Sequence, residues 1–140
     1  MKTEQEIVND FIKGHGIAVI STVTHDYLPE SAVMGISVGD NFEIVFGTII
    51  DSRKYQNLQK NPRVALVIGW DKGKTVQYEG EAQELRGDAI EEFEKAHMAS
   101  MPTAAKYVSN QDAAFFKVTP CWIKYTDASK DPWDEIEIRF

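Results

Sequence analysis

The sequence predicts a mainly β protein of the α+β class: a small antiparallel barrel of six or seven strands with three helices at its margins. One observation is a series of short segments rich in apolar and β-branched residues. A second is that several segments are joined by connections too short for a crossover helix. The chain has 140 residues, 43% of them hydrophobic, which is enough for a core without disulfides or metals. With no linker or repeat in the sequence, we expect a single domain over residues 1–140.

The predicted strands differ in how their apolar residues are arranged. The first three should form an antiparallel meander, because only short turns separate them. The strand at 63–70 is apolar on both faces, so we expect it to be central and buried on both sides. The strand at 74–84 alternates, so one face should lie inside and the other should meet solvent or a ligand. The predicted strands comprise residues 16–24, 30–38, 42–48, 63–70, 74–84, 114–125 and 135–140.

Capping residues, glycine and proline mark the ends of the predicted elements. Thr3 and Glu6 have capping-box spacing, and Gly14 is a plausible stop for the first helix. Pro62 ends the second helix, because the residue before a proline is pushed out of the α region. Pro120 implies a bulge or an edge position in the sixth strand. The predicted helices comprise residues 3–13, 54–60 and 88–99, with a short one at 104–108.

Charge and composition exclude several classes of partner. The formal net charge is −7, and the cations are scattered, so we expect no binding to nucleic acid or to an anionic membrane. The longest apolar runs, such as residues 64–68, are too short to span a bilayer, and the N-terminus lacks a signal-peptide core. The single cysteine, Cys121, cannot form an intramolecular disulfide, so we expect a reducing, cytoplasmic location.

The tripeptide Ser52-Arg53-Lys54 stands where a predicted loop enters a short helix. A hydroxyl, two cations and the unpaired N–H groups of a helix start suit an anionic group such as a phosphate. Arg53 can bind two phosphate oxygens with its planar fork, and Lys54 adds a mobile point charge. The alternative is that Ser52 is a plain N-cap and the cations are a solvated helix edge.

No motif of side-chain catalysis is present, and no catalytic residue is assigned. The three histidines, His15, His25 and His97, have no partner at metal-ligand spacing, so no metal site is expected. We interpret His25 as a solvated turn residue and Cys121 as a buried structural thiol. Any redox chemistry would therefore require a cofactor.

A longer pattern surrounds the tripeptide. It comprises residues 45–54, Leu58, Asn61, Pro62, Val64, Ala65, Leu66, Trp70, Glu79 and Gly80. This pattern resembles the pyridoxamine 5′-phosphate oxidase family, and the resemblance extends from about residue 16 to about residue 125. It implies a six-stranded antiparallel split β-barrel that forms a homodimer, with two FMN molecules in clefts at the dimer interface.

The resemblance also implies roles for individual residues. Arg53 and Lys54 would hold the FMN phosphate with Ser52 close by, and the strand that contains Gly47 and Thr48 would line the same cleft. The preceding strand would run beneath the isoalloxazine ring and offer backbone groups to its polar edge. Small residues would let the flat ring approach the backbone. The implied FMN-binding residues are Ala32, Val33, Met34, Gly35, Gly47, Thr48, Ser52, Arg53, Lys54, Thr75 and Gln77.

Two departures from the family pattern bear on the reaction. The segment that would bind a pyridoxal-type substrate phosphate, at 99–105, lacks the family's arginine, and the C-terminus lacks its Arg-x-His motif. Oxidation of pyridoxamine phosphate is therefore not expected. The leading hypothesis is an FMN-dependent oxidoreductase of an unidentified small molecule, with NADH or NADPH as a candidate electron donor. The alternatives are a non-catalytic protein for flavin storage or redox sensing, and a haem or deazaflavin binder on the same barrel.

Overall fold

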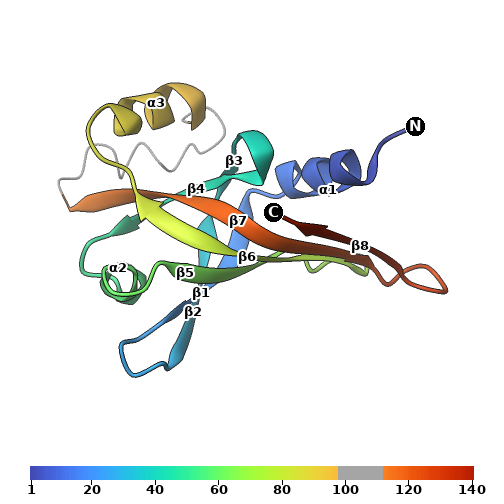
Figure 1. Ribbon diagram of the computed structural model, residues 1–140, viewed down its shortest axis with the longest axis horizontal. Coiled ribbons are helices and arrows are strands. Elements are labelled where there is room, and N and C mark those ends of the chain that lie inside the picture. Colours follow the sequence, from blue (N-terminus) through green and yellow to red (C-terminus); the bar gives the residue numbers. More distant parts are fainter. Residues whose placement is uncertain (98–111) are drawn as a thin grey trace.

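A computed structural model describes residues 1–97 and 112–140 of the chain, and it shows one curled antiparallel sheet with helices at its margins (Figure 1). The predicted fold class is confirmed. The sheet follows the order β2-β1-β5-β6-β7-β4-β3, and β8 pairs with β7 outside this path. The eight strands are β1 (Ile17–Val23), β2 (Pro29–Gly35), β3 (Ser37–Val38), β4 (Ile44–Ile49), β5 (Arg63–Ile68), β6 (Lys74–Glu84), β7 (Ala113–Asp127) and β8 (Asp134–Arg139).

The pairings of the predicted meander are confirmed, but the predicted strand at 30–38 is interrupted at Ile36. β1 and β2 form an antiparallel hairpin, and β3, the end of that predicted strand, pairs antiparallel with β4. A 3-10 helix, η1 (Asp40–Phe42), stands where a tight turn was predicted, and β4 then pairs with β7 at the far side of the sheet. In the order of the curled sheet, the β1–β2 hairpin lies on one side of β5, β6 and β7, and the β3–β4 pair lies on the other.

Two helices confirm the sequence prediction closely. In α1 (Glu4–Lys13), the Thr3 side chain accepts a bond from the Glu6 N–H, and the Glu6 carboxylate accepts one from the Thr3 N–H. Both N-terminal N–H groups are thereby satisfied, and Gly14 caps the other end. The helix α2 (Arg53–Leu58) packs against β1 and β4.

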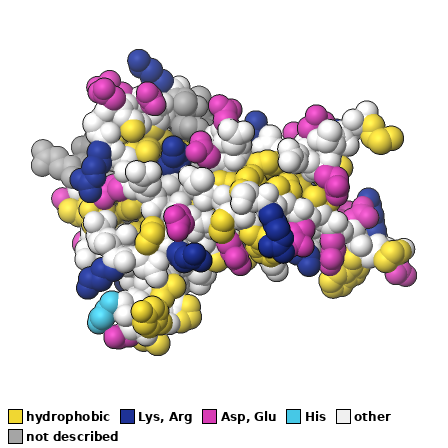
Figure 2. Space-filling view, viewed as in Figure 1, with side chains coloured by type: hydrophobic (Ala, Val, Ile, Leu, Met, Phe, Trp, Pro, Cys, Tyr) yellow, Lys and Arg dark blue, Asp and Glu magenta, His cyan; other side chains and the backbone are white. Residues whose placement is uncertain are grey.

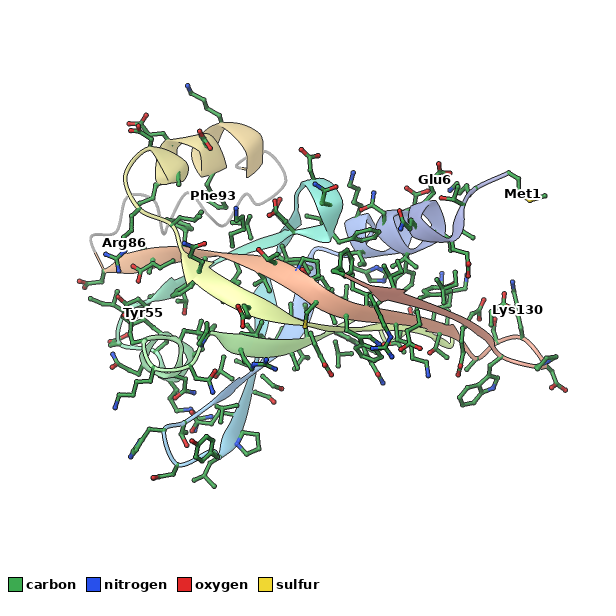
Figure 3. All side chains as sticks on the ribbon, in the orientation of Figure 1. Met1, Glu6, Tyr55, Arg86, Phe93 and Lys130 are labelled. Carbon is green, nitrogen blue, oxygen red and sulfur yellow. The ribbon has the colours of Figure 1, made fainter. Side chains whose placement is uncertain are left out.

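The third helix, α3 (Asp88–His97), covers one part of the sheet. Its Phe93 points toward the sheet (Figure 3) and packs with Val45 of β4 and Phe115 of β7. The last residues of the predicted helix at 88–99 and the short helix at 104–108 lie outside the described residues. Within the described chain, no helix is long and apolar enough to cross a membrane.

The main core lies on the inner face of the sheet, and it corrects one prediction. Val64, Leu66 and Ile68 of β5 are buried, but the residues between them, including Val67, are exposed. The prediction that this strand is buried on both sides is therefore wrong. Burial on both sides occurs instead in β4 and β7, where α3 covers the second face.

The strand β6 alternates as predicted, with Val76, Tyr78 and Ala82 facing the core. The bulge implied by Pro120 is also confirmed, because the register between β6 and β7 shifts at Glu79 and Gly80.

Candidate functional site

The Ser52 side chain caps α2 from an extended backbone conformation. Its Oγ accepts a hydrogen bond from the Tyr55 N–H at 3.2 Å and shares a second one with Thr48 Oγ1 at 2.9 Å. Ser52 is thus a true N-cap, and Thr48 of β4 lies against it. Because α2 has only six residues, its backbone adds little charge. Any anion site at this position depends on the side chains of Arg53 and Lys54.

Arg53 is engaged by a carboxylate that the sequence did not reveal. Its Nη1 lies 3.1 Å from Oε2 of Glu30, which belongs to β2. The Arg53 side chain is 72% exposed, whereas the Glu30 side chain is only 22% exposed. The guanidinium therefore reaches outward over the edge of a site whose acidic member is partly buried.

Lys54 differs from Arg53 in having no counter-ion. The side chain is half-buried, and this burial lowers the pKa of its ammonium group. Among the described residues, no carboxylate lies within ion-pair distance of it. A half-buried cation without a partner is unfavourable by itself and would gain from an anionic ligand.

These residues line a cavity of about 200 Å³ between α2 and the β1–β2 hairpin. A water molecule occupies roughly 30 Å³ of liquid, so the cavity has room for a phosphate group. Its lining combines two cations, one carboxylate, hydroxyls and a small apolar floor. The lining residues are Ile20, Thr22, Glu30, Ser31, Ala32, Ser52, Arg53 and Lys54.

A buried hydrogen-bond relay fixes the acidic side of this cavity. The Nδ2 of Asn57 donates to Thr22 Oγ1 at 2.9 Å and to Glu30 Oε1 at 3.0 Å. Thr22 and Asn57 are both buried, and the Asn57 side chain donates to both Thr22 and Glu30. The relay therefore couples β1, α2 and β2, and it sets the position of the carboxylate that faces Arg53.

The opposite, outer face of the same strands is apolar and exposed. Val33 pairs with Val19, Val19 with Val67, and Val67 with Gln77, so one row crosses four strands. Val33 is 64% exposed and Val67 is 39% exposed. We call the residues of this row, Val33, Val19, Val67 and Gln77, the outer row. Beside it is a hollow of about 500 Å³ lined by residues of β1, β5, β6 and β7, among them Ala65, Arg63 and Cys121.

Comparison with known proteins identifies the family of the chain. The family model described as pyridoxamine 5′-phosphate oxidase matches residues 5–127. The chain belongs to this family. A curated relative, the pyridoxine/pyridoxamine 5′-phosphate oxidase of Ehrlichia ruminantium (strain Welgevonden), is 30% identical over 82 residues. That match covers 58% of this chain but only 42% of the relative, so the chain spans less than half of the relative's length.

Solved structures of family type share the fold at low sequence identity. A heme binding protein from Mycobacterium smegmatis superposes with a TM-score of 0.82 at 15% identity, covering 97% of this chain and 58% of that one. An FMN binding protein related to pyridoxamine 5′-phosphate oxidase, from Nostoc punctiforme PCC 73102, gives a TM-score of 0.67 at 12% identity. This second match covers 94% of the present chain and 91% of the other. The split-barrel fold thus occurs both in a protein that binds FMN and in one that binds haem.

Five of the residues that the family resemblance implies for FMN lie together. Ala32, Ser52, Arg53 and Lys54 line the cavity beneath α2, and Thr48 is hydrogen-bonded to Ser52. Met34 instead points into the core, and Val33 and Gly35 lie beyond the cavity along β2. β2 has no strand neighbour on its second edge within the described sheet, so its backbone groups there are available to a ligand.

Gly47 has a packing role that the sequence did not indicate. A Cβ at this position would lie 2.9 Å from the ring of Phe115, its partner in the β4–β7 register. The neighbour that approaches the Gly47 backbone is therefore an aromatic side chain of the protein itself. A role for Gly47 toward a flavin stays a prediction.

Thr75 and Gln77 lie on the outer face of β6, away from the cavity beneath α2. Within one chain the structure does not bring them to Arg53 and Lys54. Gln77 belongs to the outer row, together with Val33. Both therefore stay predictions that would require a second protomer.

Two other interpretations can be compared with the structure. Cys121 was predicted to be buried, but it is exposed, because it is the residue of β7 that the bulge leaves without a partner in β6. Its Sγ donates to the Glu79 carbonyl at 3.3 Å. His25 is exposed in the β1–β2 turn as predicted, with Nε2 3.3 Å from an Asp26 carboxylate oxygen. In the described part of the chain, no three His, Cys, Asp or Glu side chains could together hold a metal ion.

Figure 2 shows hydrophobic side chains gathered at the β1–β2 hairpin, below α2 in that view. The exposed apolar residues of this turn include Tyr27 and Leu28, which are 81% and 61% exposed. Because the cavity opens beside this hairpin, its apolar side chains are available to the part of a ligand that extends beyond the cavity.

Proposed function

We propose that the protein is a flavoprotein that binds FMN with the phosphate in the cavity beneath α2. The observation that carries the proposal is the half-buried Lys54, which has no counter-ion among the described residues and stands beside Arg53. A phosphate would supply that counter-ion and would bind the planar guanidinium through two N–H groups. Family membership supports the choice of ligand, since a structural neighbour is an FMN binding protein.

The size of the cavity supports a ligand that is anchored by one end. Sites for drug-sized ligands usually measure about 300–1,000 Å³, more than the roughly 200 Å³ found here. The phosphate would lie in the cavity, and the rest of the ligand would pass over the edge of β2. There the backbone groups of β2 without a strand neighbour would meet the polar edge of a flat ring.

We propose that the reaction is a redox step on an unidentified small molecule. FMN supplies hydride or single-electron transfer when it is bound. The protein's own contribution would be to bind the phosphate with Arg53 and Lys54 and to orient the ligand along β2. Oxidation of pyridoxamine phosphate is not proposed, because the segment at 99–105 lacks the arginine that the family resemblance implies for the substrate phosphate.

We propose further that two copies associate through the outer row. The exposed Val33 and Val67, with the partly buried Val19 between them, form an apolar face that a second copy would cover. A partner protomer would also bring its Thr75 and Gln77 to the ligand, which one chain alone does not do. The single cysteine fits a reducing compartment such as the cytoplasm.

Three other ligand roles are alternatives on the same barrel. The neighbour from Mycobacterium smegmatis is a heme binding protein, and haem would require an axial ligand such as His25. A deazaflavin carries a phosphate as FMN does, and a storage protein would bind FMN without turnover. The absorption spectrum of the purified protein, alone and with each added ligand, separates haem, deazaflavin and FMN, and a turnover assay separates storage from catalysis.

The decisive experiment removes both cations of the cavity. We expect Arg53→Ala/Lys54→Ala to weaken FMN binding by about 3 kcal/mol, or roughly a hundredfold, because charge-assisted bonds to the phosphate are lost. Isothermal titration with FMN measures the change. The matched control is Lys60→Ala/Lys72→Ala, which removes two exposed cations that do not line the cavity.

The control should bind FMN as the wild type does. A wild-type protein that neither carries nor takes up FMN would contradict the proposal. If FMN binds, anaerobic mixing with NADH or NADPH, followed by air, tests turnover. Failure of every reductant to bleach the bound flavin would favour storage over catalysis.

A further inference from the structure

The cavity proposed for the phosphate contains a carboxylate, which is unusual for an anion site. Glu30 shares the lining with Arg53 and Lys54, so the three side chains sum to one positive charge instead of two. The question is what this carboxylate does when an anionic ligand arrives. The following inference rests on the proposed phosphate site.

Both carboxylate oxygens of Glu30 already have polar partners in the structure. Oε1 accepts from Asn57 at 3.0 Å, and Oε2 lies 3.1 Å from Arg53 Nη1. Asn57 is buried and is itself fixed by Thr22, so the carboxylate is held at the cavity wall and cannot swing away without breaking the relay.

A ligand phosphate would meet this carboxylate at close range. Its oxygens need the same guanidinium N–H groups that Glu30 now engages. An ion pair with an exposed member, such as Arg53–Glu30, contributes little to stability by itself. Glu30 therefore does little to stabilise Arg53 in one orientation. The repulsion between the carboxylate and the ligand grows with the charge of the ligand.

We propose that Glu30 is a specificity-determining residue of the anion cavity, where it competes with the ligand's anionic group for Arg53. Its effect depends on ligand charge: a dianionic phosphate monoester is penalised more than a monoanionic diester, and a neutral ligand is not penalised. At a separation of about 6 Å in a water-like medium, the penalty is roughly threefold in affinity per unit of ligand charge.

Glu30→Gln tests this inference, because the amide oxygen can still accept from Asn57, whereas the amide N–H groups that replace Oε2 cannot engage Arg53. Three flavins with the same ring provide a charge series: riboflavin, riboflavin 4′,5′-cyclic phosphate and FMN. We expect the variant to bind riboflavin as the wild type does, the cyclic phosphate about threefold tighter and FMN about tenfold tighter. Glu4→Gln, an exposed glutamate of α1 remote from the cavity, is the control and should change nothing.

Equal gains for all three flavins, or no gain for FMN, would overturn the role of Glu30 and leave the FMN proposal standing. If no flavin binds either protein, the proposed function fails, and inorganic phosphate followed by NMR decides the remaining question. Tighter phosphate binding by Glu30→Gln would then support the competing carboxylate, and unchanged binding would overturn it. Unfolding monitored by circular dichroism verifies that the variant is folded.

Discussion

The strands β1 and β2 present two surfaces of opposite character. On the inner side, Thr22 and Glu30 join Asn57 in a hydrogen-bonded relay beneath α2. On the outer side, Val19 and Val33 belong to an apolar row that is largely exposed. Successive residues of a strand point to opposite faces, so a single stretch of sequence builds both surfaces.

The two surfaces differ in whether their side chains already have partners within one chain. In the cavity, Arg53 pairs with Glu30, Asn57 donates to Thr22 and Glu30, and no buried side-chain N or O atom of the described residues lacks a hydrogen-bond partner. In the outer row, by contrast, Val33 and Val67 are exposed to solvent. The cavity should therefore act in a single protomer, and the outer row should act only in a pair.

The largest expected effect comes from placing a charge in the outer row. Val67→Asp would put a carboxylate into the proposed dimer interface, and we expect the dimer dissociation constant to rise about a hundredfold or more. Light scattering with size-exclusion chromatography measures the change. Because Val67 is 39% exposed within one chain, the protomer itself should stay folded.

The control for this variant is Ile7→Asp, since Ile7 on α1 is 37% exposed and lies outside the outer row. It should leave the oligomeric state unchanged. The Val67→Asp monomer should still bind inorganic phosphate as the wild type does. Loss of phosphate binding in a folded monomer would refute the view that one chain completes the cavity.

Breaking the relay beneath α2 should have a smaller effect, but on stability. Asn57→Ala removes two hydrogen bonds and leaves the buried Thr22 hydroxyl without its donor. We expect a loss of about 2 kcal/mol in the free energy of unfolding, because an unsatisfied buried polar group costs ~1–3 kcal/mol. Urea denaturation provides the measurement.

Gln59→Ala is the matched control at the end of α2. Gln59 is exposed, and its contact with Glu84 is long, at 3.4 Å. Its removal should change stability by less than about 0.5 kcal/mol. An equal loss of unfolding free energy in both variants would show that the relay contributes no more to stability than an exposed contact does.

The sequence predicted the features that depend on local spacing. Thr3 and Glu6 satisfy each other across one helical turn, and the alternation of β6 follows from the period of a strand. Ser52 was recognised because capping is also local. The cluster of Ser52, Arg53 and Lys54 was therefore within reach of sequence analysis.

Features that depend on strand register were not predictable in this way. Glu30 meets Arg53 only because β2 folds back on β1, which pairs Glu30 with Thr22. One local signal existed: Asn57 stands four residues after Arg53, on the same side of α2. Burial of a strand on both faces also depended on a distant element, since α3 covers β4 and β7 and leaves β5 open.

The smallest expected effect is a pH dependence of the cavity. Burial lowers the pKa of Lys54, so its folded pKa lies below its unfolded pKa. The charged form therefore opposes folding below the folded pKa, and this cost disappears as the pH rises through both values. Phosphate binding depends on pH in the opposite direction, because it requires the ammonium form of Lys54.

FMN affinity, measured by fluorescence titration at increasing alkaline pH, should consequently decline a few-fold. The decline should begin at a lower pH than that at which an ordinary lysine loses its proton. Lys54→Arg stays charged throughout and should remove this decline, whereas riboflavin, which lacks the phosphate, should show none of it in either protein. An identical decline for FMN in the Lys54→Arg variant would assign the titration to another group and would separate Lys54 from the phosphate.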